Sequence, residues 1–359
     1  MSGHRAPGLV AAWRLPEGSA EPVLSVDLSR TDGAILSAAG RLLATGGVRA
    51  HGFLSSSASA RTHHMEVQGG DELEPLVLLH GAAGGGANWF AVARELARHR
   101  RVLAPDLPGF GLSSGLDPGR PLGRRTARRI ASWLRGLGVR RFALCGTSFG
   151  GLVAAHLAAR RDLEVTRLVL VDSAGLGRAV HPFIRMASSA FIRPAVGVSS
   201  RAGGRALFRG LMVYRSDAIP SERREALLDY LHASGSAGGD RAIARGLPHF
   251  VSWAGQRERA DLYVIPRLDC PVLAVCGEHD AIFPARHVKR LQGRLDSVQA
   301  RVIPDAGHSP MWEVPEALLG AVDAFLGGGR QEIRAPDVPR RARAGPGTMR
   351  AGGFAAGRP

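Results

Sequence analysis

Three residue types that can act together in nucleophilic catalysis occur in separate parts of the chain, in the order serine, aspartate, histidine. Ser148 lies between two glycines in Gly-Thr-Ser-Phe-Gly, Asp280 ends Gly-Glu-His-Asp, and His308 lies in Ala-Gly-His-Ser-Pro. A free serine hydroxyl is a weak nucleophile, so it needs an adjacent base such as histidine, which an acidic side chain can orient. The alternative for Ser148 is a turn residue without chemistry, because serine and glycine are common in tight turns.

The elements predicted around these residues are alternating strands and helices. An unbroken apolar run at 75–81 suits a strand buried on both faces. Further strands and helices continue the alternation: strands at 63–68, 101–106, 141–146, 166–172, 270–277 and 301–304, and helices at 87–99, 124–138, 149–160, 285–294 and 315–326. This pattern predicts a mostly parallel sheet with right-handed crossovers. Because ligands bind beyond the carboxyl ends of such strands, Ser148, Asp280 and His308 should meet at one edge of the sheet.

The alternation divides the middle of the chain into a core and an insertion. Residues 61–175 and 265–326 carry the strand–helix pattern and form the two parts of one predicted α/β core. Residues 176–264 contain helix-like pieces with no clear strand between them. The sequence therefore predicts one sheet domain with a helical insertion after the strand at 166–172.

The two ends of the chain have different patterns. Residues 1–60 form an N-terminal extension whose role the sequence does not define, with a short helix predicted at 33–47 and a linker at 55–59. Residues 327–359 consist largely of Gly, Pro and Arg. Such a segment lacks the apolar content that offsets ordering entropy, so we expect a disordered tail.

The motifs, taken together and in this order, resemble the α/β-hydrolase fold family, and within it the capped, esterase- or lipase-like serine hydrolases. They comprise HG at 80–81, DLPGFG at 106–111, GTSFG at 146–150, GEHD at 277–280 and AGHSP at 306–310. GTSFG matches the nucleophile elbow of that family, whose partners follow in the order Ser, Asp, His. The resemblance covers about residues 63–326. It implies a doubly wound, mostly parallel sheet with a helical cap inserted after the sixth strand.

The resemblance also implies a role for each site residue. Ser148 would be the nucleophile, His308 the general base, and Asp280 the acid that orients the imidazole. The oxyanion hole would use the backbone N–H groups of Phe149 and Ala82, with Ala83 as the second choice for the latter. Gly146 and Gly150 would allow the helix and the neighbouring strand to pack close to the turn.

Several other polar residues have competing interpretations. Asp172 ends the preceding strand and is the rival for the triad acid, and Asp305 lies three residues before His308. Asp106 is expected to shape a turn, and His80 to brace the oxyanion loop. His279, beside Asp280, is expected to be a packing residue rather than a second base. The histidine pair at 63–64 is expected to form no metal site, because the histidines of this chain lack metal-ligand spacing.

Composition limits the classes of partner. The formal net charge is +16, yet almost all basic residues are arginines, with Lys289 as the exception, as a coding bias toward Arg would produce. The basic stretches carry no interleaved aromatic residues, so no nucleic-acid partner is expected. Three cysteines are too few for a disulfide framework, and no apolar run reaches membrane-spanning length. We expect a soluble cytoplasmic protein that uses neither cofactor nor metal and does not insert stably into membranes; a homodimer stays open.

The predicted substrate is an apolar carboxylic ester of small to medium size. A serine nucleophile argues against epoxide or haloalkane hydrolysis, for which relatives use Asp. The insertion offers apolar side chains for a pocket: Phe183, Ile184, Met186, Phe191, Leu207, Phe208, Leu211, Met212 and Tyr214. Carbon–carbon bond hydrolases of this family carry Asn before the nucleophile and Trp after the histidine, where this chain has Thr147 and Ser309. Acyl transfer and a non-catalytic binding module are the remaining alternatives.

Overall fold

The structure of the protein is a computed structural model that describes residues 9–327 apart from 17–18, 20, 26–27, 58–59, 116–118, 120 and 190–200. The tail predicted at 327–359 therefore lies outside the described residues, except for Gly327. Within the described residues, no helix is both long and apolar enough to span a membrane.

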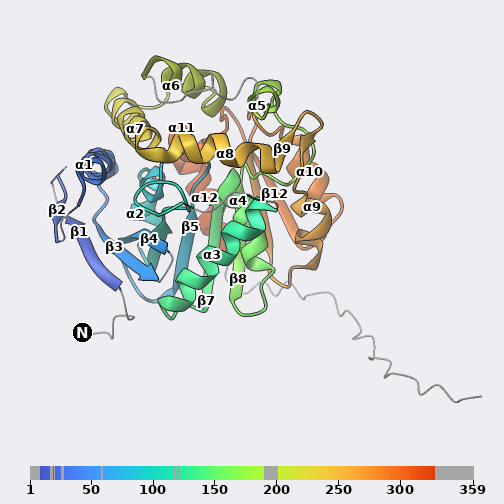
Figure 1. Cartoon of the computed structure of the whole chain (residues 1–359). Coiled ribbons are helices and arrows are strands. Elements are labelled where there is room, and N and C mark those ends of the chain that lie inside the picture. The colour runs from blue at the N-terminus through green and yellow to red at the C-terminus, as the bar shows by residue number, and fades with distance from the viewer. Residues whose placement is uncertain are drawn as a thin grey trace, which may run out of the picture. The chain divides into compact units, whose positions relative to one another are not determined.

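Ten strands of the described residues form one sheet in the order β12-β11-β8-β7-β5-β6-β4-β3-β1-β2 (Figure 1). The strands from β12 to β6 run parallel to one another, and every pair from β6–β4 to β1–β2 is antiparallel. The mostly parallel sheet predicted from the sequence is confirmed. The strand bounds are β1 Leu9–Leu15, β2 Val23–Leu24, β3 Ala50–Ser57, β4 Ala60–Val67, β5 Leu73–Leu79, β6 Arg100–Pro105, β7 Arg141–Thr147, β8 Glu164–Val171, β11 Val272–Gly277 and β12 Val298–Ile303.

The sheet separates two apolar cores, because successive side chains of a strand point to opposite faces. In β5, Leu76 and Leu78 belong to one core, whereas Val77 and Leu79 belong to the other. This arrangement explains the unbroken apolar run of that strand. The helices outside the insertion cover the two faces: α1 Arg30–Thr45, α2 Ala93–Leu96, α3 Leu122–Gly136, α4 Phe149–Ala158, α10 Arg286–Gln292, α11 Pro310–Glu313 and α12 Pro315–Leu326.

The N-terminal extension is part of this fold. Its predicted helix at 33–47 is confirmed as α1, but the linker expected at 55–59 is wrong in its described part, because Ser55 to Ser57 extend β3 and pair with β4. Serine is tolerated here because backbone ladder bonds, rather than apolar side chains, form the pairing. Leu36, Leu42 and Leu43 of α1 pack in the same core as β5.

The helical insertion follows β8, as predicted, and returns to the sheet at β11. The resemblance implies an insertion after the sixth strand of the family fold. In this chain the strand before the insertion is the eighth, because β1 to β3 precede the strands that the sequence predicts. The insertion contains α5 Pro182–Ala187, α6 Arg201–Leu207, the π-helical turn η3 Phe208–Met212, α7 Ser221–Ser234, a second π-helical turn η4 Gly235–Gly239, α8 Asp240–Phe250, the short hairpin β9 Val251–Ser252 and β10 Gly255–Gln256, and α9 Ala260–Tyr263. Figure 1 shows α5 to α8 grouped at one edge of the sheet, where they form a cap.

The helix predicted at 87–99 is wrong as a single element. The chain instead forms a 3-10 turn, η1 Gly86–Trp89, and then the separate short helix α2. The apolar residues that suggested helical spacing, Trp89, Phe90 and Val92, are all buried. Burial in a tight turn therefore produced the same periodicity as burial along a helix.

Leu42→Ala tests whether the N-terminal extension is integral to the fold. Leu42 is fully buried, so the substitution should lower the free energy of unfolding by about 2–5 kcal/mol. Leu24→Ala is the matched control, because Leu24 is 49% exposed and should change stability by less than about 0.5 kcal/mol. Urea denaturation measures both, and equal effects would contradict the integration of this segment.

Candidate active site

Ser148 lies at a strained turn between β7 and α4. Its backbone has φ 53° and ψ −122°, in the left-handed half of backbone space, and its N–H donates to the Val171 carbonyl at 3.0 Å. A Cβ at position 146 would lie 2.5 Å from the Gly150 carbonyl oxygen, and one at position 150 would lie 2.3 Å from that of His80. The close packing expected at both glycines is confirmed. The turn lifts Ser148 clear of the sheet and leaves it partly exposed.

His308 and Asp280 come from the loops that follow β12 and β11. His308 Nδ1 lies 3.0 Å from each carboxylate oxygen of Asp280. Asp280 Oδ1 also accepts the backbone N–H groups of Ile282 at 2.7 Å and Phe283 at 3.0 Å. The two side chains are 2% and 0% exposed, so solvent does not compete with this pairing. A buried carboxylate in this position fixes which imidazole nitrogen carries the proton and how the ring is oriented.

Ser148 and His308 line one cavity of about 200 Å³ beneath the cap. The Ser148 hydroxyl has no hydrogen-bond partner within the described part of the chain, and Gly81 approaches it closely, since a Cβ there would lie 3.6 Å from Oγ. Phe149 begins α4, so its N–H has no acceptor inside the helix. Ala82 lines the same cavity as Ser148. Phe149 therefore adjoins Ser148 along the chain, and Ala82 borders the cavity that contains Ser148.

Most of the apolar cap residues that were predicted to form a pocket line this cavity. Phe183, Ile184, Leu207, Phe208, Leu211 and Met212 all line the cavity. Met186 is 38% exposed, and Tyr214 instead stacks on His279 with ring centroids 3.8 Å apart. Phe191 lies outside the described residues. The resulting cavity is mainly apolar.

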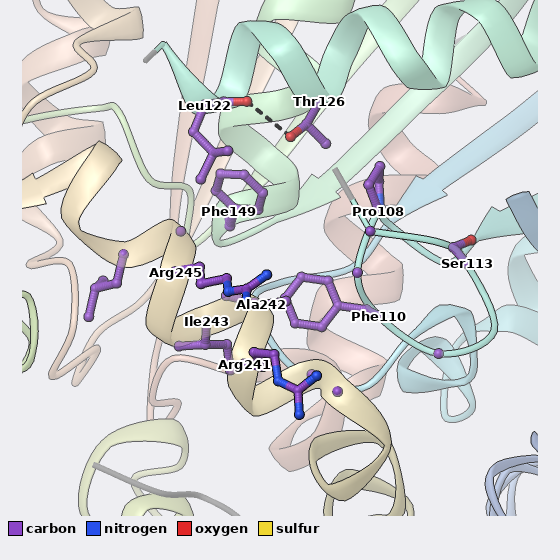
Figure 2. Close-up of a pocket in the computed structure, with 18 of the residues that line it drawn as sticks. Pro108, Phe110, Ser113, Leu122, Thr126, Phe149, Arg241, Ala242, Ile243 and Arg245 are labelled. Atoms are coloured by element: carbon purple, nitrogen blue, oxygen red, sulfur yellow. Dashed lines mark hydrogen bonds between the residues drawn. The ribbon is translucent and has the colours of Figure 1, made fainter. Parts of the chain in front are cut away.

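A second cavity of about 300 Å³ adjoins the first (Figure 2). It lies between α8 of the cap and the loop that carries Pro108 and Phe110. The two cavities share part of their walls: Ala82, Gly239, Ile243, Leu247 and Phe250.

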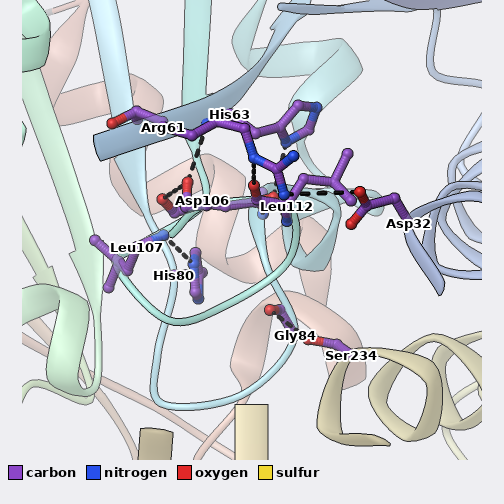
Figure 3. A network of polar contacts seen from close by, with 12 residues as sticks. Asp32, Arg61, His63, His80, Gly84, Asp106, Leu107, Leu112 and Ser234 are labelled. Carbon is purple, nitrogen blue, oxygen red and sulfur yellow. Dashed lines mark hydrogen bonds and ion pairs between the residues drawn. The ribbon is translucent and has the colours of Figure 1, made fainter. Parts of the chain in front are cut away.

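A buried polar network holds the glycine-rich loop that carries Ala82 (Figure 3). Asp106 Oδ1 accepts the Gly86 N–H at 2.8 Å, and Oδ2 accepts that of Leu112 at 2.9 Å. His80 Nε2 accepts the Leu107 N–H, and Nδ1 lies 2.7 Å from the Gly81 carbonyl. The bracing role expected of His80 and the turn-shaping role expected of Asp106 are confirmed.

The charges of this network follow from its burial and contacts. Burial alone would raise the pKa of Asp106, but the hydrogen bonds that its carboxylate accepts from His63 and from the Gly86 N–H outweigh burial and lower the pKa below the ordinary value. Burial lowers the pKa of His80, against the opposing effect of Asp106. His80 is thus neutral at pH 7, with its proton on Nδ1 for the Gly81 carbonyl.

His63 connects Asp106 to the N-terminal extension. The Trp13 indole N–H donates to His63 Nε2 at 2.9 Å, and His63 Nδ1 lies 2.7 Å from Asp106 Oδ2. Because an indole nitrogen can only donate, Nε2 is the acceptor and Nδ1 carries the proton given to Asp106. Sequence reasoning treated residues 63–64 only as a structural pair and missed the hydrogen bonds of His63 to Trp13 and Asp106. No local sequence pattern predicts them, because the three residues are far apart in the chain.

The cap also contacts the glycine-rich loop. The Ser234 hydroxyl of α7 donates to the Gly84 carbonyl at 2.9 Å (Figure 3). A Cβ on Gly85 would lie 2.5 Å from the Tyr230 hydroxyl oxygen, so α7 packs directly on this loop. Both α7 residues are buried.

Asp172 lies behind the Asp280 carboxylate rather than on the histidine. Asp172 Oδ1 accepts the Gly277 N–H at 2.8 Å, and one atom each of Asp172, Cys276 and Asp280 lie within 4.8 Å of one another. Burial and the Asp280 charge raise the pKa of Asp172 well above its ordinary value. Burial likewise raises the pKa of the Cys276 thiol. Asp172 and the Cys276 thiol therefore favour their protonated forms, so Asp172 is a neutral carboxyl beside Asp280.

Asp305, the other aspartate considered as the partner of His308, does not contact the histidine. Asp305 is exposed at φ 54°, outside the buried pairing of His308 with Asp280. The structure thus brings Ser148, Asp280 and His308 to one edge of the sheet and places Asp172 next to Asp280. Sequence reasoning named Asp172 only as a competitor, whereas the two carboxyl groups follow the paired strands β8 and β11 and therefore lie close together.

Comparison with known proteins gives a consistent result. Residues 74–315 match the alpha/beta hydrolase fold family. The chain is 30% identical over 263 residues to the dihydrolipoyllysine-residue acetyltransferase component of an acetoin cleaving system from Pseudomonas putida, covering 72% of this chain and only 65% of that protein's length. It is 25% identical over 279 residues to a 2-hydroxy-6-oxo-6-(2'-aminophenyl)hexa-2,4-dienoic acid hydrolase from Metapseudomonas resinovorans, covering 76% and 89%. A thermophilic esterase from Thermogutta terrifontis superposes with a TM-score of 0.59 at 26% identity, covering 76% and 96%.

Asp172→Asn tests the neutral carboxyl. A carboxyl whose pKa is raised in the folded state stabilises that state below its unfolded pKa, about 3.9 for Asp, and this contribution is lost as the pH rises toward the folded pKa. Asparagine does not ionise. The free energy of unfolding of the variant should therefore gain on that of the wild type as the pH rises above about 4. Urea denaturation across this range measures the difference, with the exposed Asp305→Asn as control; a constant difference would contradict the neutral form.

Trp13→Phe tests the link between the N-terminal extension and the glycine-rich loop. The variant leaves the buried His63 Nε2 without its donor, so the free energy of unfolding should fall by about 1–3 kcal/mol. Trp253→Phe is the control, because Trp253 is 60% exposed. Chemical denaturation compares the two, and a loss no greater than that of the control would refute the link.

Proposed function

The chain belongs to the alpha/beta hydrolase fold family, and on that basis we propose that it is a serine hydrolase that cleaves an apolar carboxylic ester through an acyl-enzyme. Ser148 is the nucleophile, His308 the general base, and Asp280 the acid that orients it. The observation that carries this proposal is the buried His308–Asp280 pair at 3.0 Å, which opens onto the same cavity as Ser148.

The first half of the reaction forms the acyl-enzyme. His308 takes the Ser148 proton as Oγ attacks the ester carbonyl, and Asp280 stabilises the imidazolium without accepting its proton. The Phe149 and Ala82 amides donate to the oxyanion of the tetrahedral intermediate. Removing one such donor typically costs about 3–4 kcal/mol of transition-state stabilisation. His308 then gives its proton to the leaving alkoxide, which departs as an alcohol.

The second half releases the acid. His308 takes a proton from a water molecule, whose oxygen attacks the acyl carbon, and returns it to Ser148 Oγ as the carboxylic acid leaves. The apolar walls of the cavity, including Phe183, Leu207 and Phe208, support an apolar acyl or alcohol group. The substrate is thus a small molecule.

Hydrolysis of a carbon–carbon bond is the second candidate. The similarity to the Metapseudomonas resinovorans hydrolase, over 89% of its length, favours it. Thr147 and Ser309 argue against it, since they replace the Asn and Trp expected at these positions for that activity. Ester cleavage is therefore the preferred function.

Ser148→Ala tests the proposal with p-nitrophenyl esters from acetate to palmitate. The wild type should show burst kinetics, and the variant should lose activity by roughly a thousandfold or more, because triad members act as a unit. The chain-length optimum then reports the size of the apolar cavity.

Covalent labelling separates an enzyme from a binding module on the same fold. A fluorophosphonate should label the wild type at Ser148 and leave Ser148→Ala unlabelled. If neither protein reacts and both are inert toward all esters, the esterase proposal fails.

A further inference from the structure

The second cavity, between α8 and the loop after β6, has an apolar floor and two cations at its edge. Phe110, Leu122, Phe149 and Phe250 supply apolar surface. Arg241 and Arg245 are the charged side chains among its described lining residues, which include no aspartate or glutamate. Figure 2 shows both arginine side chains extending from α8 on the side of the helix that faces Phe110.

The two arginines lie one helical turn apart and are both exposed. Like charges at this spacing repel each other and destabilise a helix slightly. Other arginines of the described residues, such as Arg101 and Arg259, form ion pairs with carboxylates. No such pair involves Arg241 or Arg245 in the described residues, so both guanidinium groups remain available to a ligand.

Close packing fixes α8 relative to the loop. Gly109 has φ 90°, and a Cβ at this position would lie 2.9 Å from the Ala242 methyl group. Ala242 lies between the two arginines in sequence and contributes to the cavity wall. The small residues at this contact hold the helix against the loop and place the arginines at the edge of the cavity.

The cavity borders the nucleophile site. Ala82, a proposed oxyanion donor, lines both cavities, and Phe149 lines the second one directly. A ligand whose ester carbonyl lies at Ser148 can therefore extend one arm past Ala82 toward the arginines. The arm needs an apolar body for the phenyl and leucyl surface, and an anionic end for the guanidinium groups, whose planar fork matches a carboxylate.

We propose that this second cavity is a substrate subsite, and that the preferred substrates are esters with a carboxylate at the far end of one arm. The inference rests on the proposed ester hydrolysis at Ser148 and deepens it by naming the substrate class. Arg241 and Arg245 bind the carboxylate, while Phe110 and Leu122 contact the apolar part of the same arm.

Two pairs of esters test the preference for a carboxylate in either arm. Mono-p-nitrophenyl adipate is compared with p-nitrophenyl hexanoate for the acyl arm, and meta-acetoxybenzoate with phenyl acetate for the alcohol arm. In at least one pair, the ratio of kcat/KM for the charged to the neutral ester should fall at least about fivefold in Arg241→Gln/Arg245→Gln. The control Arg161→Gln/Arg294→Gln removes the same charge from exposed sites elsewhere and should keep the wild-type ratio.

Calorimetric titration of monomethyl adipate into Ser148→Ala protein measures the subsite without turnover. Binding that weakens when Arg241 and Arg245 are replaced, and not in the control, supports the subsite whether or not any ester is hydrolysed. If the Arg241→Gln/Arg245→Gln protein binds monomethyl adipate as tightly as the Arg161→Gln/Arg294→Gln protein, the subsite proposal is overturned. It is also overturned if neither protein binds this ligand. Hydrolysis of p-nitrophenyl hexanoate by the wild type reports on the proposed function separately, so the two failures are distinguishable.

Discussion

The tight turn at Ser148 is the constraint on which the rest of the site depends. A non-glycine residue at φ 53° is held in an unfavourable backbone conformation, so the surrounding structure must supply the energy that keeps it there. That energy comes from elements packed almost backbone to backbone, with Gly146 and Gly150 as the residues that allow it. The Ser148 N–H bond to Val171 ties the turn to the neighbouring strand. Ser148 is therefore positioned by the sheet rather than by its own side-chain contacts.

Two buried carboxyl systems support the chemistry on either side of this turn, and they differ in charge. On one side, Asp106 is held ionised by His63 and backbone amides and thereby fixes the glycine-rich loop. On the other side, Asp172 is held neutral next to Asp280, because two adjacent buried carboxylates would repel. Burial raises the pKa of both carboxyl groups. The groups next to them decide the final direction, because the neighbours of Asp106 lower its pKa and the Asp280 charge raises that of Asp172 further. Asp106 is thus held in its ionised form and Asp172 in its neutral form, although both side chains are buried.

Much of this arrangement was predictable from the sequence, because the decisive signals are local. Apolar runs define the buried strands, and GTSFG, GEHD and AGHSP each lie directly after one of them. The missed features depend on contacts between distant segments. Trp13, His63 and Asp106 are far apart in sequence, and β3 contains serines that pair through the backbone alone. The choice between Asp172 and Asp280 was likewise not settled by sequence, since both follow strands that turn out to be neighbours.

The hydrogen bond between Ser234 and Gly84 connects the cap directly to the glycine-rich loop of the core. The same backbone segment that carries Ala82 is bonded to α7 through this hydroxyl and packs against Tyr230. A displacement of α7 away from this loop would remove the bond to Gly84 and free the backbone next to Ala82, so the position of the cap and the conformation of the loop are coupled.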